Sequence, residues 1–164
     1  LIDMVISNKE RMTKEECEMI GCILTGHGSF ATGLGGALEM IAGQQENFET
    51  VCFLEEKSLE TFSEDMRDAM SSLRQKCSGV IVFSDLLGGT PFRTAMIEAQ
   101  AFEDVEVIAG VNLPILLESM VLRYGSESLI DFIASALEAG KTGLVHAQLP
   151  QESETQTFDE EEGI

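Results

Sequence analysis

The sequence predicts an α/β fold: an open, mainly parallel sheet with helices on both faces. Short apolar runs alternate along the chain with longer segments of helical periodicity, which is the pattern of successive β-α-β units. The 164 residues include 44% hydrophobic residues, enough to bury one good core, so a single domain is expected. No apolar stretch approaches the roughly 20 residues that a membrane-spanning helix needs.

The first half of the chain contains two predicted strands and two predicted helices. A buried strand is predicted for the apolar run MIGCILTG (19–26), and a helix for the glycine-rich SFATGLGGALEMIAG (29–43). The second strand is expected in FETVCFLEE (48–56). The segment SLETFSEDMRDAMSSLRQK (58–76) has apolar residues at spacings of three and four, which predicts an amphipathic helix. Its predicted core side chains are Leu59, Phe62, Met66, Met70 and Leu73.

The second half continues this alternation. A third strand is predicted at Gly79–Phe83, followed by a helix in TPFRTAMIEAQAF (90–102). A fourth strand is expected in VEVIAGVNLP (105–114), and two more helices follow around 114–124 and 127–139. Strands that alternate with helices in this way form parallel β-α-β units.

The two ends differ from the middle of the chain. Residues 1–18 are mostly polar and form an N-terminal extension, which could be a frayed helix, an artificial addition or sequence upstream of a natural start at Met19. The folded domain is expected at 19–150. Residues 151–164 are acidic and almost free of apolar side chains, which predicts a disordered tail.

Charge and cysteine content exclude several classes of function. With 29 acidic and 10 basic residues, the net charge is −19, which argues against nucleic-acid phosphates and anionic membranes and favours a protein partner with a basic face. The sequence has no C-x-x-C pair, so neither a disulfide scaffold nor a zinc site is expected, and no cofactor or metal is implied. The cysteines are Cys17, Cys22, Cys52 and Cys77. Without a secretory signal pattern, the protein is expected to be soluble and cytoplasmic.

Two polar loops follow predicted strands, and both carry reactive groups. His27 lies in TGHGSF after the first strand, and Asp85 lies in SDLLGGTPF after the third. In an open parallel sheet, ligands bind just beyond the carboxyl ends of the strands. His27 and Asp85 are therefore expected at the same edge, where they could meet as a pair.

Such a pair, together with the second loop, suits a phosphoryl group held on histidine. An aspartate that accepts a hydrogen bond from one ring nitrogen of His27 fixes the tautomer and leaves the other nitrogen as a nucleophile. Gly88 and Gly89 let backbone N–H groups approach an oxyanion. Thr90 is predicted as the N-cap and Pro91 as the first helical residue, so that a helix amino end also faces the site.

Three segments carry a resemblance to a known family. TGHGSFATGL, FSDLLGGTPF and VIAGVNLP resemble the signature segments of the mannose-family enzyme IIA component of the bacterial phosphoenolpyruvate:sugar phosphotransferase system. The similarity runs from about Met19 to about Pro150. The segment LLGGTPFR and the acidic segment EEGI most resemble the corresponding sequences of the N-acetylgalactosamine or galactosamine branch.

The resemblance implies a phosphocarrier. In that family the histidine matched by His27 takes a phosphoryl group from the phosphocarrier protein HPr and passes it to a IIB component, which serves membrane IIC and IID components. The aspartate matched by Asp85 orients the histidine, and the residue matched by Thr90 contacts the phosphoryl group. The family fold adds an antiparallel edge strand, matched here by TGLVHAQLP (142–150), which is exchanged between the subunits of a homodimer.

Structural interpretations of the same residues remain open at this point. His27 could be a structural histidine, Asp85 a turn former and the Thr90–Pro91 pair only a helix cap. His146 lies in the expected edge strand, outside the three motifs, and is interpreted as structural. Arg93 could steer an incoming phosphate or simply be solvated.

Other functional classes compete with the phosphocarrier. The segment GHGSFA (26–31) satisfies G-x-G-x-x-A after a strand, and Glu55 could bind a ribose, so a dinucleotide-binding domain is an alternative. Against it, the chain has no room for a second substrate domain. A second alternative is a regulatory module of the same fold, phosphorylated to modulate a transcription factor or kinase. Serine-hydrolase chemistry is disfavoured because HGSF lacks the G-x-S-x-G elbow.

Overall fold

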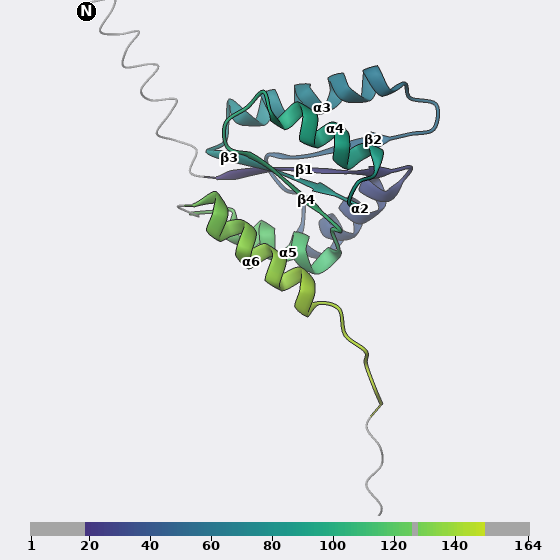
Figure 1. Cartoon of the computed structure of the whole chain (residues 1–164). Coiled ribbons are helices and arrows are strands. Elements are labelled where there is room, and N and C mark those ends of the chain that lie inside the picture. The colour runs from purple at the N-terminus through teal and green to yellow at the C-terminus, as the bar shows by residue number, and fades with distance from the viewer. Residues whose placement is uncertain (1–18, 126–127, 150–164) are drawn as a thin grey trace, which may run out of the picture.

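The computed structural model describes residues 19–125 and 128–149, and in these ranges four strands alternate with five helices (Figure 1). The N-terminal extension at 1–18 and the acidic tail at 151–164 lie outside the described residues. In chain order the elements are β1 (Ile20–His27), α2 (Phe30–Ala42), β2 (Phe48–Phe53), α3 (Leu59–Arg74), β3 (Gly79–Ser84), α4 (Thr90–Ala99), β4 (Val105–Ala109), α5 (Leu113–Leu122) and α6 (Leu129–Thr142).

Every predicted strand and helix between residues 19 and 142 is present, but two strands end earlier than expected. β4 stops at Ala109 because Gly110 adopts a left-handed conformation with φ of +79°. Asn112 then caps α5, where the prediction still placed a strand. β2 likewise stops at Phe53 and is followed by a turn.

The four strands form one parallel sheet in the order β2-β1-β3-β4, which confirms the predicted open parallel sheet. The chain passes from β1 to β2 on one side and then crosses to β3 on the other side of β1. The strand order therefore reverses between β1 and β3, and such a switch point is the usual ligand site of an open α/β sheet. Within the ranges the structure describes, the expected antiparallel edge strand is absent, because Gly143–Leu149 forms no strand.

Side-chain alternation along the strands divides the core between the two faces of the sheet. Ile23 packs with α3 and α4 on one face, whereas Cys22 and Leu24 pack with α2, α5 and α6 on the other. Figure 1 shows these two helix layers above and below the sheet. All six residues of the inner strand β3 are buried, as expected for a strand covered on both faces.

The amphipathic period predicted for α3 is confirmed for four of its five apolar residues, because Phe62, Met66, Met70 and Leu73 are buried. Leu59 was predicted with them but is 53% exposed. The reason is its place as the first residue of α3, directly after the cap Ser58 and before the turns that pack on the sheet.

A buried arginine joins the elements at the amino end of the sheet. Arg123, fully buried after α5, donates from Nη1 to the Glu46 carbonyl at 2.6 Å and from Nη2 to the Gln45 side chain at 3.2 Å. Burial raises the pKa of the neighbouring Cys22 thiol to about 12, although the Arg123 charge opposes the shift. Cys22 is therefore a neutral core residue, as its position in an apolar strand predicts.

A buried carboxylate fixes α4 against α3. Glu98 of α4 is only 4% exposed and accepts hydrogen bonds from the Ser63 hydroxyl and, at 2.7 Å, from Nε of Arg67. A buried charge is tolerated when it is paired and hydrogen-bonded in this way. The contact matters for the site because α4 begins beside the carboxyl end of β3.

None of the helices in the described ranges is both long enough and apolar enough to cross a lipid bilayer.

We predict that Glu98→Ala lowers the free energy of unfolding by about 2 kcal/mol, because it leaves Ser63 and Arg67 without their acceptor and opens a small cavity. Urea unfolding followed by circular dichroism measures this difference. The control is Glu103→Ala, which removes an exposed carboxylate and should change stability by less than about 0.5 kcal/mol. Equal losses in the two variants would show that the buried network contributes nothing.

Candidate functional site

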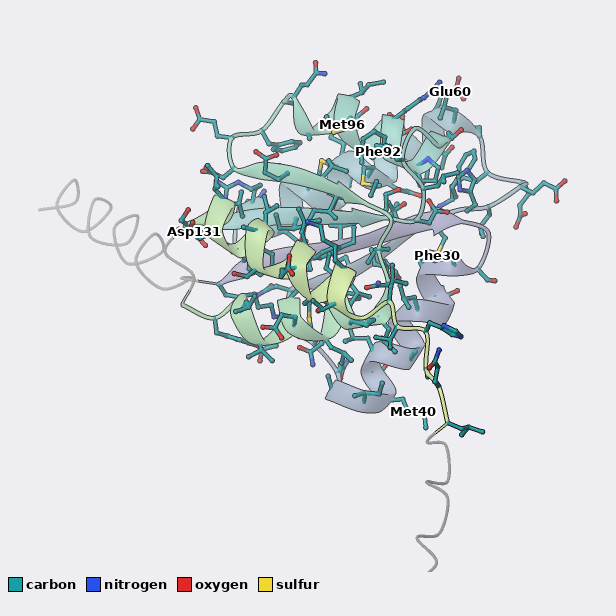
Figure 2. All side chains as sticks on the ribbon, turned by 60° about the horizontal axis from the view of Figure 1, so that its bottom comes forward. Phe30, Met40, Glu60, Phe92, Met96 and Asp131 are labelled. Carbon is teal, nitrogen blue, oxygen red and sulfur yellow. The ribbon has the colours of Figure 1, made fainter. Side chains whose placement is uncertain are left out.

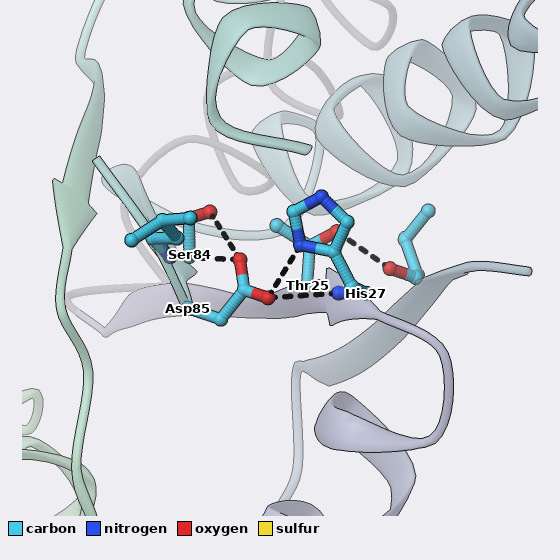
Figure 3. Close-up of polar contacts among 6 residues, drawn as sticks. Thr25, His27, Ser84 and Asp85 are labelled. Atoms are coloured by element: carbon cyan, nitrogen blue, oxygen red, sulfur yellow. Dashed lines mark hydrogen bonds and ion pairs between the residues drawn. The ribbon is translucent and has the colours of Figure 1, made fainter. Parts of the chain in front are cut away.

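The two residues singled out by their loops meet at the switch point of the sheet. His27 is the last residue of β1, and Asp85 directly follows β3, the neighbouring parallel strand. Thr25 holds the end of β1 against β2, because its buried hydroxyl donates to the Val51 carbonyl at 2.6 Å (Figure 3). The strands thus bring His27 and Asp85 together, as the parallel sheet predicts.

One carboxylate oxygen of Asp85 binds His27 twice. Oδ2 accepts a hydrogen bond from the His27 backbone N–H at 2.9 Å and lies 2.7 Å from the imidazole Nδ1 (Figure 3). With the carboxylate ionised, Nδ1 is the donor, and the neutral ring then has its lone pair on Nε2. The arrangement leaves Nε2 as the nitrogen available to react.

The other oxygen of Asp85 is also held. Oδ1 accepts a hydrogen bond from the Leu86 backbone N–H at 2.8 Å, and the Ser84 hydroxyl lies 3.4 Å away. Burial raises the pKa of Asp85, but hydrogen bonds from the backbone and ring of His27 and the Leu86 amide lower it, and the net pKa lies below its usual value. The carboxylate is therefore ionised and fixed at neutral pH.

Two glycines are required by the close approach of groups around the imidazole. A Cβ at Gly26 would lie 2.6 Å from Cδ1 of Phe30 and 3.0 Å from Cγ of Asp85. Phe30 is labelled in Figure 2 at the start of α2, at the opposite end of that helix from Met40. A Cβ at Gly89 would lie 2.8 Å from Cε1 of His27. Any side chain at Gly26 or Gly89 would therefore displace part of the site.

The amino end of α4 lies next to the imidazole. Gly89 is its N-cap, Thr90 its first residue and Pro91 its second, so the prediction that Thr90 is the cap is wrong. The cause is that Gly89 already has the extended conformation of a cap. In the described part of the chain no side chain caps this helix, which leaves its first amides able to bind an anion. Gly88, with φ of +78°, forms the left-handed turn before it.

An aromatic residue that sequence reasoning missed also contacts the histidine. Phe53, at the end of β2, is the register partner of His27, and the two rings meet edge to face with centroids 5.9 Å apart. The ring of Phe62 in α3 packs against the ring of Phe53, with centroids 5.0 Å apart. Hydrophobic periodicity places Phe53 in a strand, but only the strand order puts that strand beside β1.

The remaining candidate residues lie elsewhere or form no site. Arg93 is exposed on α4. His146 is exposed in a segment without regular structure and not in an edge strand. Glu55 is exposed in the turn after β2. Among the described residues, His, Cys, Asp and Glu form no cluster of three or more that could hold a metal ion.

The imidazole is open to large partners. The His27 side chain is 46% exposed, whereas that of Asp85 is only 13% exposed. A nucleophilic nitrogen at an open surface, beside an uncapped helix amino end, can accept and release an anionic group carried by another protein.

Comparison with known proteins agrees with this chemistry. A protein-family model described as EIIA-man, PTS system fructose IIA component, matches residues 21–137. The PTS system fructose-specific EIIA component of Bacillus subtilis is 34% identical over 105 residues, covering 64% of this chain and 71% of that protein. Among solved structures, the crystal structure of phosphotransferase system component EIIA from Streptococcus agalactiae superposes with a TM-score of 0.68 at 32% sequence identity. The match covers 78% of this chain and 97% of that chain.

A longer relative matches over part of its length. The PTS system mannose-specific EIIAB component of Escherichia coli K12 is 34% identical over 125 residues, which are 76% of this chain. The match covers 38% of the length of that relative.

We predict that Asp85→Asn lowers the free energy of unfolding at pH 7 by about 1 kcal/mol, because the amide is a weaker acceptor than the charged carboxylate. A carboxylate whose pKa is lowered on folding stabilises the fold fully above its unfolded pKa of about 3.9. This contribution is lost as the pH falls through the lower, folded pKa. The difference in free energy of unfolding between the native chain and Asp85→Asn should therefore become smaller below about pH 4.

Urea unfolding between pH 3 and pH 7 measures this difference in free energy of unfolding. Asp68→Asn, which removes one exposed negative charge from α3, is the matched control. A difference for Asp85→Asn that stays constant down to pH 3 would contradict a native carboxylate held charged by His27 and Leu86.

Proposed function

The chain belongs to the mannose–fructose family of PTS IIA components, phosphotransferases that serve sugar uptake, and from this premise we propose that His27 is its phosphoryl carrier. The observation that carries the proposal is the 2.7 Å contact between Nδ1 of His27 and Oδ2 of Asp85. It directs Nε2 away from the carboxylate and supports Asp85 as the residue that orients the ring.

The proposed reaction exchanges one N–P bond for another. The lone pair of Nε2 attacks the phosphorus of the donor phosphohistidine, the donor N–P bond breaks, and its electron pair returns to the donor nitrogen. His27 keeps the proton on Nδ1, where the Asp85 carboxylate stabilises the positive charge that the ring acquires. Transfer to the acceptor is the same step in reverse, with Nε2 as the leaving group.

The start of α4 and the turn before it are proposed to bind the phosphoryl oxygens. Gly89 approaches the imidazole so closely that a Cβ there would lie 3.6 Å from Nε2. A group bonded to Nε2 would therefore lie near the first amides of α4 and the Thr90 hydroxyl, with Gly88 shaping the turn. Pro91 has no N–H, so the Thr90 and Phe92 amides of this first turn are the ones proposed to donate.

The proposed partners follow from the family. We propose HPr as the donor and a IIB component as the acceptor, with membrane IIC and IID components served indirectly, and a cytoplasmic location that suits these partners. Within the family we assign the chain to the N-acetylgalactosamine or galactosamine branch, from LLGGTPFR at 86–93 and EEGI at 161–164. Growth of a deletion strain on each sugar tests the branch.

The protein is further proposed to be a homodimer that exchanges its C-terminal edge strand. Residues Gly143–Leu149 lie exposed after α6, with Leu144, Val145 and Leu149 each more than three-quarters exposed. β4 pairs with β3 on one side only in the described part of the chain. An unpaired strand edge and an exposed apolar segment can satisfy one another across two copies.

We predict that His27→Ala takes up no phosphate from phosphoenolpyruvate, enzyme I and HPr, because it removes the accepting nitrogen. His146→Ala, the matched control, should still gain one phosphoryl group. Intact mass spectrometry measures both variants. Phosphate on the His27 variant would place the carrier elsewhere.

A second prediction concerns assembly. A chain that ends at Leu149 should remain a dimer, whereas one that ends at Gly143 should become monomeric or insoluble, because the exchanged strand is gone. Light scattering at micromolar concentration distinguishes these outcomes. A compact monomer for the chain ending at Leu149, or a stable dimer for the shorter chain, would exclude the exchange.

A further inference from the structure

Phe53 reaches the imidazole from the strand on the other side of β1 from Asp85. In the order β2-β1-β3, His27 ends the middle strand, Phe53 ends β2 and Asp85 follows β3. Phe53 is the register partner of His27, and the two rings meet edge to face with centroids 5.9 Å apart. The imidazole is therefore contacted by a carboxylate from one neighbouring strand and by an aromatic ring from the other.

The contacts from the β3 side restrain one edge of the imidazole. Oδ2 of Asp85 lies 2.7 Å from Nδ1, and the Cβ position of Gly89 lies 2.8 Å from Cε1. The His27 side chain is 46% exposed, so water competes with Asp85 for its ring nitrogens. A ring held only along the Nδ1–Cε1 edge can swing away from the carboxylate.

Phe53 is itself firmly held. Phe62 of α3 is fully buried, and its ring packs against that of Phe53 with centroids 5.0 Å apart. The Phe53 carbonyl accepts a hydrogen bond at 2.8 Å from the N–H of Gly28, the residue that follows His27. The backbone of Phe53 thus fixes the chain beside His27, and its ring contacts the imidazole. A ring supported in this way can limit the motion of its neighbour.

We propose that Phe53 is a positioning residue for phosphoryl transfer, because its ring keeps the imidazole of His27 against Asp85. Phe53 acts through the imidazole and not on the phosphoryl group. Without its ring, the imidazole turns about the bonds of its side chain toward β2, which weakens the contact of Nδ1 with Asp85 and moves Nε2 away from the start of α4. A small displacement of a reacting atom lowers the rate of transfer. This inference rests on the proposed function of His27.

Phe53→Leu tests this role, because it removes the aromatic ring and keeps an apolar side chain at the end of β2. With phospho-HPr as donor, the maximal rate should fall about tenfold and the KM should change less than about twofold, since alignment is lost while donor binding is kept. With phosphoramidate, a small donor, the labelling rate should fall by a similar factor, because the imidazole itself is misplaced. Phe53→Tyr, which keeps an aromatic ring, should recover most of the native maximal rate.

The tautomer of His27 gives a second readout that needs no phosphoryl transfer. Nuclear magnetic resonance of ¹⁵N-labelled histidine, at a pH where the ring is neutral, should show the proton on Nδ1 in the native chain. In Phe53→Leu, part of the population should carry the proton on Nε2, because the ring is less often bound to Asp85.

Phe48→Leu is the matched control, because Phe48 is the first residue of the same strand and packs on the opposite face of the sheet from Phe53. This variant should lower the free energy of unfolding in urea, since a buried part of the ring is lost. It should leave the transfer rate and the tautomer of His27 unchanged.

The outcomes separate the inference from the function on which it rests. Native rates and a native tautomer in Phe53→Leu would overturn the positioning role, as would a Phe53→Tyr chain as slow as Phe53→Leu. A loss with phospho-HPr but not with phosphoramidate would also overturn it, since Phe53 would then serve donor binding. Equal effects of Phe48→Leu would do the same by showing a general loosening of β2. A native chain that neither donor labels would instead refute His27 as the phosphoryl carrier, and the tautomers would still decide whether Phe53 positions the ring.

Discussion

The oxygen Oδ2 of Asp85 connects the ends of two strands and sets the state of the imidazole between them. It accepts hydrogen bonds from both the backbone and the ring of His27, across the switch point between β1 and β3. The close approach needs a glycine at position 26, because Asp85 and Phe30 occupy the space that a side chain there would fill. The tautomer of His27, and hence the identity of the free nitrogen, depends on this one oxygen.

The elements around the pair restrict how that nitrogen can be used. Phe53 and the backbone of Gly89 limit the position of the ring, and the buried Glu98 holds α4, whose amino end lies beside Nε2. The carboxylate is sheltered while the imidazole stays exposed. An open, oriented imidazole of this kind suits exchange of the group with another protein.

Much of this arrangement could be predicted from sequence, and the exceptions have physical causes. Apolar runs and helical spacing predict the elements, and parallel strands bring His27 and Asp85 to one edge. Periodicity carries no information on strand order, so it does not identify Phe53 as a neighbour of His27. The sequence Gly-Thr-Pro predicted Thr90 as the cap, but the extended backbone of Gly89 takes that place. The edge strand could not form in an isolated chain if its pairing partner belongs to another copy.

By binding Nδ1, Asp85 leaves Nε2 of His27 as the nitrogen that we propose carries phosphate. Nuclear magnetic resonance of the phosphorylated protein, labelled with ¹⁵N in its histidines, measures which ring nitrogen is coupled to phosphorus. The expected result is coupling at Nε2 and a proton retained on Nδ1. Phosphorus coupled to Nδ1 would contradict it, because that nitrogen is the one bound to Asp85.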